Sequence, residues 1–455
     1  MRRWPLRMRA GAAVALLPLL VASCAPPPAP PTPPGAGVPT PAPVPPAAPP
    51  PAPLPPLALH EEPMVTVGLA WDRDTLQLAA LDNASFRHAP WPDARDLPSH
   101  GSLRLRAESS GVRVETLRAK AWETMFVSSP RDTCWLAALQ PTGPVARWNG
   151  KQWRGALGVF LNPRGRLTLV ARLPLETYLQ GVVPSEIGAL GDDRIEAGRA
   201  QAIAARSYTL FYRGRRAAEG FDLFGTVEDQ FYGAVESEKP LATRCVAETR
   251  GQVAVWEGQP IRANYCSTCG GISAEVWEAW PTPALGYLTS HRDRAHGTDF
   301  CSGSAHYRWR ETWTADEFMA NLARFGPANG VPPPPSGWGD LVDASVASRS
   351  RSGRVWDLRV TTTTGVVEIP AYVIRLVLRR GGQPGAILRS NLFKLAVKRD
   401  PATRAATAVV ASGAGSGHGV GLCQTGALAM AQAGAKAREI LEHYYPGARL
   451  ETLYH

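Results

Sequence analysis

Hydrophobic and polar residues alternate with a period of two along residues 64–175. Glycine, asparagine and proline separate the apolar runs, which include MVTVGLAW, SLRLRAES and RLTLVARL. Such alternation is typical of half-buried β-strands, and the Asn149–Gly150 pair between two runs is typical of a tight hairpin. The pattern therefore predicts a β-rich N-terminal part over about 63–175.

The spacing of apolar residues changes to that of a helix over residues 192–217. Asp192 or Asp193 is the expected cap, and arginines follow near the expected end. A second helical pattern runs over about 426–445 and stops at a Pro-Gly pair. Both segments are therefore predicted to be helices.

Strand-like runs return between the two predicted helices, at 251–266 and 356–378. The second of these runs ends in a short helical pattern. Because strands and helices are mixed without a regular βαβ alternation, we predict an α+β fold that is rich in mixed β-sheet. The part that follows the β-rich region spans about 176–455.

The N-terminus has the features of an export signal. Four arginines precede an apolar run over about 10–22, which is too short to span a bilayer as a helix. The run ends in LVASC, the pattern of a lipoprotein signal in which the cysteine receives a lipid. We therefore predict that residues 1–23 are a signal peptide and that Cys24 is lipidated and anchors the chain to a membrane. An ordinary signal peptide with an incidental cysteine is the alternative.

Proline dominates the next segment, with 18 prolines among the 33 residues 25–57. Such a composition cannot bury apolar surface, so residues 24–62 are predicted to be a disordered, semi-rigid tether that reaches roughly 100 Å at about 3.1 Å per residue. The globular body is then 63–455. An anchor with a stiff tether suits a body in the exported cell envelope that works at a distance from its membrane, either the outer membrane or the outer face of the inner membrane.

The charge of the chain argues against one class of partner. The formal net charge is +10, and four of the positive charges are arginines of the predicted signal, which leaves +6. This charge is modest and scattered along the chain, so no nucleic acid partner is expected.

A single carboxylate stands out in the stretch GVVPSEIGALGDD. Glu186 follows a proline and is followed by five residues without another acid. It could be a solvated acid at the start of a helix, or a general acid whose pKa is raised by apolar surroundings.

Three stretches resemble a known family when they are taken in order. They are PLETYLQGVVPSEI with RAQAIAARSY, then YCSTCGG, and then SGHGVGLCQTGALAMAQAG with ILEHYYPGA. Together they resemble the SpoIID/LytB family (stage II sporulation protein D), whose members include peptidoglycan lytic transglycosylases and an amidase enhancer. The resemblance spans about 64–455, and it makes 176–455 the expected catalytic core.

The resemblance implies a function and a set of site residues. Glu186 matches the family's catalytic acid, and a lytic transglycosylase needs only one carboxyl group because no water attacks the sugar. The expected partner is the peptidoglycan glycan strand, and no cofactor is required for the chemistry. The residues expected to bind substrate are Arg206, Tyr265, Gly270, Gly271, His418 and Gln424.

The last stretch departs from the family pattern at one position. Cys423 takes the place held by serine or cysteine in the family, but Thr425 takes a place often held by an aromatic residue. A stacking role at position 425 is therefore in doubt. The chain also lacks a G-x-S-x-G nucleophile motif, which argues against a serine or cysteine hydrolase.

Six cysteines follow Cys24. The Cys266-x-x-Cys269 pair, with Cys301 and His306 beyond it, has the ligand types of a structural zinc site. An exported chain meets an oxidising compartment, where an even number of cysteines can pair completely, so disulfides are equally expected.

Two functions are compatible with the whole sequence. The first is cleavage of glycan strands with a single glutamate as acid and base, which leaves 1,6-anhydroMurNAc ends. The second is a non-catalytic, peptidoglycan-binding enhancer of a cell-wall amidase. The intact VVPSE motif favours the first.

Overall fold

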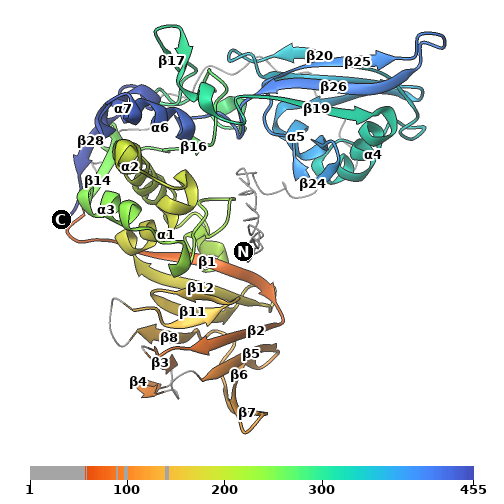
Figure 1. Cartoon of the computed structure of the whole chain (residues 1–455). Helices are drawn as coiled ribbons and strands as arrows, with labels where there is room; N and C mark the ends of the chain where they lie inside the picture. Colours follow the sequence, from red (N-terminus) through yellow and green to blue (C-terminus); the bar gives the residue numbers. More distant parts are fainter. Residues whose placement is uncertain (1–56, 58, 83, 89–90, 97–100, 139–142) are drawn as a thin grey trace, which may run out of the picture.

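The computed structural model describes residues 57, 59–82, 84–88, 91–96, 101–138 and 143–455 (Figure 1). The predicted signal peptide, the lipid site at Cys24 and nearly all of the predicted tether lie outside the described residues. No helix in the described part of the chain is both long enough and apolar enough to cross a membrane.

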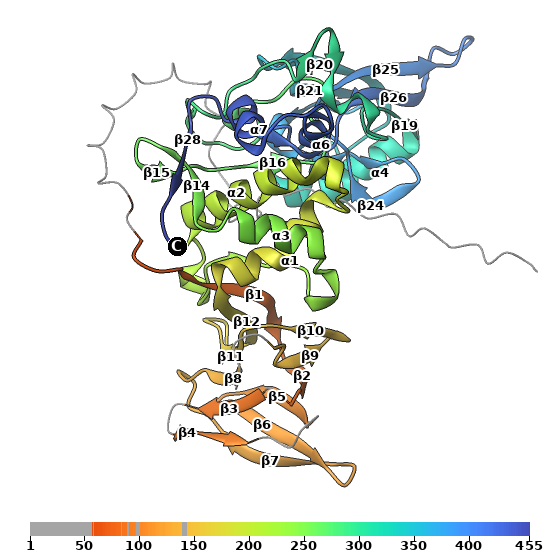
Figure 2. The same cartoon turned by 60° about the vertical axis from the view of Figure 1, so that its left-hand side comes forward.

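Two sheets, here called the N-terminal sheets, form the base of the molecule in Figures 1 and 2, and their strand pairs are antiparallel except for β1 with β13. The alternating pattern of 64–175 does form strands, and most of their buried residues are apolar. One sheet has the order β13 (Leu223–Phe224), β1 (Met64–Arg73), β12 (Leu167–Pro174), β11 (Ala156–Leu161), β8 (Cys134–Ala138), β3 (Ala84–His88) and β4 (Trp91–Asp96). The other has the order β10 (Lys151–Trp153), β9 (Ala146–Trp148), β2 (Thr75–Ala80), β5 (Ser102–Glu108), β6 (Gly111–Arg118) and β7 (Ala121–Val127).

The hairpin between β9 and β10 confirms the turn predicted from its sequence. Asn149 and Gly150 have φ values of 50° and 72°, and Trp148 pairs with Lys151 across the turn. Positive φ at both turn residues matches the twist of the flanking strands, and asparagine and glycine tolerate it best.

A helical unit lies above these sheets (Figure 1). Its central helix, α2, is buried on nearly all sides because alanines allow its neighbours to approach closely. The helices are α1 (Leu175–Ile187), α2 (Ile195–Tyr212), α3 (Pro240–Glu248), α6 (Gln424–Gln432) and α7 (Ala437–Tyr444). Short strands complete the unit: β15 (Gln259–Pro260), β14 (Gln252–Trp256) and β28 (Arg449–Thr452) in one sheet, the parallel pair β16 (Tyr265–Cys266) and β27 (Leu422–Cys423), and the pair β17 (Arg294–Ala295) and β18 (Thr298–Asp299).

The helix boundaries differ from those predicted. The helix expected from residue 192 begins as a 3₁₀ turn, Asp192–Arg194, and becomes α2 only at Ile195. The single helix expected over 426–445 is two helices, α6 and α7, because the chain turns at Gly434 with φ of 98°. The apolar periodicity predicted that these segments are helical, but it did not predict where each helix begins and ends.

Residues 308–414 form a third unit, which lies at the top of Figures 1 and 2. Its hydrophobic cluster is separate from the one that the N-terminal sheets share with the helical unit. The part expected as one catalytic core thus contains a body with a core of its own. Its elements are β19 (Arg308–Thr314), β26 (Ala406–Ala414) and β25 (Phe393–Arg399) in one sheet, β20 (Leu341–Arg349), β21 (Val355–Thr362) and β22 (Gly365–Pro370) in another, the pair β23 (Arg379–Arg380) and β24 (Gln383–Ile387), and the helices α4 (Ala315–Phe325) and α5 (Ala371–Val377).

Candidate functional site

Glu186 lies in the last turn of α1, not in a turn before a helix as expected. Its helix contains Pro184, which has no N–H to donate to the carbonyl one turn earlier. The helix ends at Gly188, whose φ of 80° is a conformation that favours glycine. The stretch VVPSEI therefore places the acid at a C-terminal end, where the helix carbonyls disfavour a negative charge. The sequence had suggested the opposite influence, that of a helix N-terminus.

The Glu186 carboxyl is half-buried and has two hydrogen-bond donors. The backbone N–H of Phe231 donates to its Oε1 atom at 2.7 Å, and the side-chain amide of Gln424 donates to the same carboxyl group. Burial raises the pKa of Glu186 to about 7, against the opposing effect of these two hydrogen bonds. A carboxyl group with this pKa can give and take a proton near neutral pH.

A hydrogen-bonded network holds the segment that supplies the Phe231 N–H. The Gln230 side chain donates to Thr209 Oγ1 at 2.8 Å and to the Tyr178 hydroxyl at 3.4 Å, and its Oε1 atom accepts from the Tyr265 hydroxyl at 2.8 Å. Tyr265, which was expected to contact substrate, is half-buried in this network. Its hydroxyl group binds Gln230, the residue before Phe231. The network orders the backbone beside Glu186.

Phe231 and Gln230 were missed by the sequence analysis. Phe231, whose backbone N–H donates to Glu186, is 41% exposed, and an exposed aromatic ring is a suitable surface for a sugar. The only signal in the sequence was a Gln-Phe-Tyr-Gly stretch, and such a stretch is common in packed loops. The contact that gives it meaning joins residues 45 positions apart.

Arg206 was expected to bind substrate, but the structure places it in the core. Its side chain is fully buried and donates to both oxygens of Glu176, at 2.8 and 2.6 Å, and to the carbonyl of Gln252 at 3.0 Å. The Tyr454 hydroxyl also donates to Glu176. Arg206 therefore ties α2 to α1 and to the C-terminus, and it presents no surface to a ligand.

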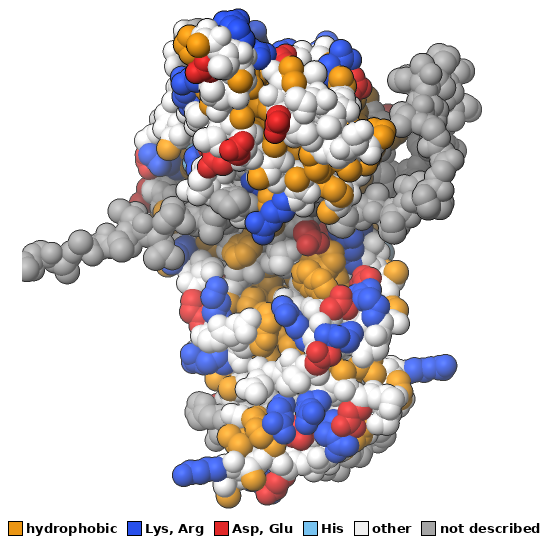
Figure 3. Space-filling view, turned by 90° about the vertical axis from the view of Figure 1, so that its right-hand side faces the viewer, with side chains coloured by type: hydrophobic (Ala, Val, Ile, Leu, Met, Phe, Trp, Pro, Cys, Tyr) orange, Lys and Arg blue, Asp and Glu red, His pale blue; other side chains and the backbone are white. Residues whose placement is uncertain are grey.

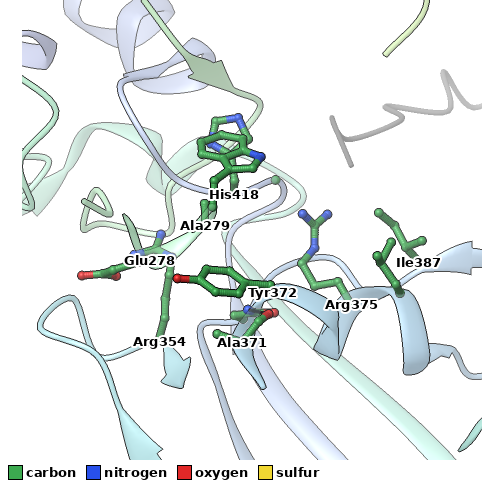
Figure 4. A pocket seen from close by; sticks show the side chains of 12 residues that line it. Glu278, Ala279, Arg354, Ala371, Tyr372, Arg375, Ile387 and His418 are labelled. Atoms are coloured by element: carbon green, nitrogen blue, oxygen red, sulfur yellow. Dashed lines mark hydrogen bonds between the residues drawn. The ribbon is translucent and has the colours of Figure 1, made fainter. Parts of the chain in front are cut away.

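His418 lies in a pocket between the helical unit and the third unit (Figure 4). Its Nδ1 atom accepts from the N–H of Val420 at 3.0 Å, and its ring packs against Trp280 at 4.7 Å. Burial, with nearby arginines that include Arg375, lowers the pKa of His418 to about 3. The imidazole is therefore neutral, and because Nδ1 is an acceptor its proton is on Nε2. Tyr372, Arg375 and Arg354 of the third unit line the same pocket.

Gly270 and Gly271 line a second groove, also between these two units. A side chain at Gly270 would lie 2.9 Å from Ala414, and one at Gly271 would collide with the Asp299 carboxylate. Close packing within the protein thus explains both glycines. The groove is rich in positive charge, and its cationic lining residues are Arg292, Arg294, Arg308, Arg349 and Lys394. Elsewhere charges of both signs are interspersed, as the view in Figure 3 shows.

The residues predicted as metal ligands fall into two groups. Cys269 and Cys301 lie together, with their sulfur atoms 3.7 Å apart. Cys266 and His306 lie outside this group, and Cys423 and Asp293 take their places. The His306 ring instead lies near Arg389 and Arg380, which together with burial lower its pKa. None of the cysteines in the described part of the chain forms a disulfide.

Two segments of the chain match families of known proteins. Residues 163–256, which include α1 and Glu186, match the family model of the stage II sporulation protein SpoIID. Residues 293–421, which enclose the third unit, match a domain of unknown function, DUF8618. The chain is thus an α+β protein in which a SpoIID domain carries an isolated carboxyl group.

Three relatives extend the match beyond the SpoIID domain. The stage II sporulation protein D of Bacillus subtilis is 28% identical over 296 residues, which cover 62% of this chain and 75% of that protein. An uncharacterized protein of Brachyspira hyodysenteriae is 27% identical over 303 residues, 66% of this chain and 72% of the relative. The amidase enhancer of Bacillus subtilis is 27% identical over 305 residues, 60% of this chain but 40% of that protein. Residues 163–256 therefore resemble SpoIID, and two of the relatives that match more of the chain are named stage II sporulation protein D and amidase enhancer.

Proposed function

We propose that this protein cleaves the glycan strands of peptidoglycan as a lytic transglycosylase, with Glu186 as the only acid and base. The observation that carries the proposal is the Glu186 carboxyl group itself: it is isolated, half-buried and has a pKa of about 7. A substantial fraction is then protonated at neutral pH and able to donate.

The reaction needs two proton transfers at one group. Protonated Glu186 donates to the glycosidic oxygen, and the bond from that oxygen to C1 of MurNAc breaks. The C6 hydroxyl of the same sugar then attacks C1, and its proton returns to Glu186, which leaves a 1,6-anhydro ring. No water is consumed, so the second carboxylate of ordinary glycosidases is not required. Phe231 N–H and the Gln424 amide stabilise the carboxylate between the two transfers.

One neighbouring carboxylate of the loop has a structural task. Asp229, two residues before Phe231, accepts from Arg215 at 3.0 Å and from the N–H of Phe224 at 2.9 Å. It is buried and held in place, which is consistent with a single reacting carboxyl group.

We propose Phe231, Tyr265, Gln424 and His418 as contacts for the sugar rings.

Replacing Glu186 with glutamine tests the proposal. Glu186→Gln keeps the shape of the side chain and removes the transferable proton. General acid–base catalysis contributes about 10²–10⁴-fold, so release of anhydro-muropeptides from purified sacculi should fall at least about a hundredfold while sacculus binding persists. Mass spectrometry of the digest measures the release, and Glu451→Gln, at an exposed position of β28, is the matched control. Near-normal release by Glu186→Gln would exclude this residue as the acid.

The relative that is named an amidase enhancer supports a second function. In this alternative the protein binds peptidoglycan without cutting it and stimulates a cell-wall amidase. A parent protein that releases no anhydro-muropeptides, but accelerates an added amidase on the same sacculi, would replace the first proposal with the second.

We further propose that the protein works in the cell envelope, tethered to a membrane by a lipid on Cys24. The LVASC end of the predicted signal and the proline-rich segment directly after it support this placement.

A further inference from the structure

Three thiols and a carboxylate meet at one point inside the helical unit. The ligand atoms of Cys269, Asp293, Cys301 and Cys423 all lie within 4.8 Å of one another, and all four residues are buried. They come from four separate segments of the chain. We propose that this group binds one structural zinc ion.

The spacing of two of the sulfur atoms fits a tetrahedral ion. Zinc–sulfur bonds of about 2.3 Å place two sulfur ligands about 3.8 Å apart. The Sγ atoms of Cys269 and Cys301 are 3.7 Å apart, and Asp293 Oδ2 lies 2.9 Å from Cys269 Sγ. A set dominated by sulfur selects zinc over magnesium or calcium, which prefer oxygen ligands.

The surrounding groups orient the ligand atoms inward. The second oxygen of Asp293, Oδ1, accepts from the Tyr444 hydroxyl at 2.9 Å and contacts His443 Nε2 at 3.1 Å, so Oδ2 is left for the ion. Backbone N–H groups also point at sulfur: Cys269 N–H donates to Cys423 Sγ at 3.2 Å, and Gly271 N–H donates to Cys269 Sγ at 3.4 Å. Such outer contacts are typical of metal ligands.

A disulfide explains less of this arrangement. Three sulfur atoms can form only one disulfide, which would leave the third sulfur without a covalent partner and the Asp293 carboxylate with His443, when protonated, as its charged neighbour. A buried carboxylate is costly unless a positive charge or a metal compensates for it. A divalent cation accounts for all four groups at once.

The ion would also position the candidate acid site, and this step rests on the proposed function. Cys423 is followed directly by Gln424, the first residue of α6, whose amide donates to Glu186. Cys423 also belongs to β27, which pairs with β16 at Cys266. Zinc bound to Cys423 would therefore fix the backbone that carries Gln424. Cys423 is a positioning residue in this scheme, not a catalytic one.

Metal content and thiol content test the site without reference to activity. Full-length protein purified without chelator should contain about one zinc per chain by elemental analysis. The six cysteines that follow Cys24 should all react as free thiols after denaturation with chelator. Replacement of zinc by Co²⁺ should produce the intense near-ultraviolet absorption of thiolate–cobalt bonds. A chain with no zinc and fewer than six free thiols would overturn the inference in favour of a disulfide.

Two substitutions separate the structural ligand set from the one suggested by sequence spacing. Cys423→Ser should lose most of the zinc and the cobalt absorption, whereas the control Cys266→Ser should retain both. The reverse result would overturn the proposed ligand set. If Cys423→Ser does not fold, Asp293→Asn provides the same comparison, with the cobalt spectrum expected to shift or weaken. A failed glycan-cleavage test would leave these readouts unchanged, so the two proposals fail independently.

Discussion

The carboxyl group of Glu186 is held by neighbours that act on its charge in opposite directions. Burial and the C-terminal end of α1 disfavour the carboxylate, while Phe231 N–H and the Gln424 amide favour it. The first effect is larger, and the pKa is raised from 4.5 to about 7. A group balanced in this way can donate a proton and then persist as an anion.

This balance has a consequence for stability that can be measured. Because the folded-state pKa lies above the unfolded value of 4.5, the folded protein binds the proton more tightly. The contribution of this proton to stability is complete below about pH 4.5 and is lost as the pH rises through about 7. Glu186→Gln removes this dependence, so its melting temperature should exceed that of the parent above pH 7 and match it near pH 4.5.

Thermal unfolding across pH 4.5–8.5 measures this difference. Glu451→Gln provides the control, because position 451 is exposed on β28. If the melting temperature of Glu186→Gln differed from that of the parent by the same amount at every pH, the charged form of the carboxyl group would not be destabilised by burial.

At the residue scale, the sequence singled out Glu186 as the candidate acid but did not show what surrounds it. The isolation of Glu186 and its family motif were visible in the chain, and so was the Gln424 stretch. Arg206 could not be assigned correctly, because a buried arginine and a ligand-binding arginine look alike without knowledge of Glu176. The sequence could not group Asp293 with the cysteines, because the Asp293 carboxylate is held near them by its contact with Tyr444 of α7.

At the scale of elements, α1 was the main surprise. Leu175, Tyr178, Leu179, Val182 and Val183 have helical spacing, and all are buried. Pro184 nevertheless suggested a turn, because a proline inside a helix removes a hydrogen bond. One turn from the end of the helix this loss is tolerated by the packing of α1 against α2 and α3. Local propensity was overridden by tertiary burial.

The contact between α1 and the Phe231 segment depends on a glycine. A Cβ atom on Gly181 would collide with the carbonyl oxygen of Gly233 and lie 2.6 Å from the Tyr232 ring. Gly181→Ala should therefore destabilise the protein by about 1–3 kcal/mol, although alanine favours a helix interior by about 1 kcal/mol. Urea-induced unfolding measures the change.

The collision in Gly181→Ala should also push the segment that carries the Phe231 N–H away from Glu186. Glycan cleavage by this variant should therefore be weaker. Gly385→Ala is the matched control, since a side chain there meets no neighbouring atom. A more stable Gly181→Ala protein would show that the segment yields without strain and would contradict this account of the contact.

At the scale of the whole molecule, the sequence indicated the order of the parts. Strands precede a mixed body, as the change in periodicity predicted, and the fold is mixed and rich in sheet. The separate core of the third unit was not predicted, because its strand patterns resemble those of the N-terminal sheets. Only the three-dimensional packing shows that its apolar residues face one another.

The lipid proposed on Cys24 would decide where the whole molecule resides. Cys24→Ala should abolish labelling by a palmitate analogue, since no thiol remains at the end of the predicted signal to receive the lipid. Cys245→Ser, at a cysteine of α3, should keep the label. Gel fluorescence of labelled cells measures the outcome, and persistent labelling of Cys24→Ala would exclude this anchor.

The third unit joins the rest of the chain at one place. The chain enters it through β19 and leaves through β26, and the outermost positions of these strands, Arg308 and Ala414, are paired neighbours. A segment whose two ends meet can be inserted into a chain without redirecting the residues that flank it. The third unit therefore has the topology of an insertion, and the helix that carries Glu186 lies outside it.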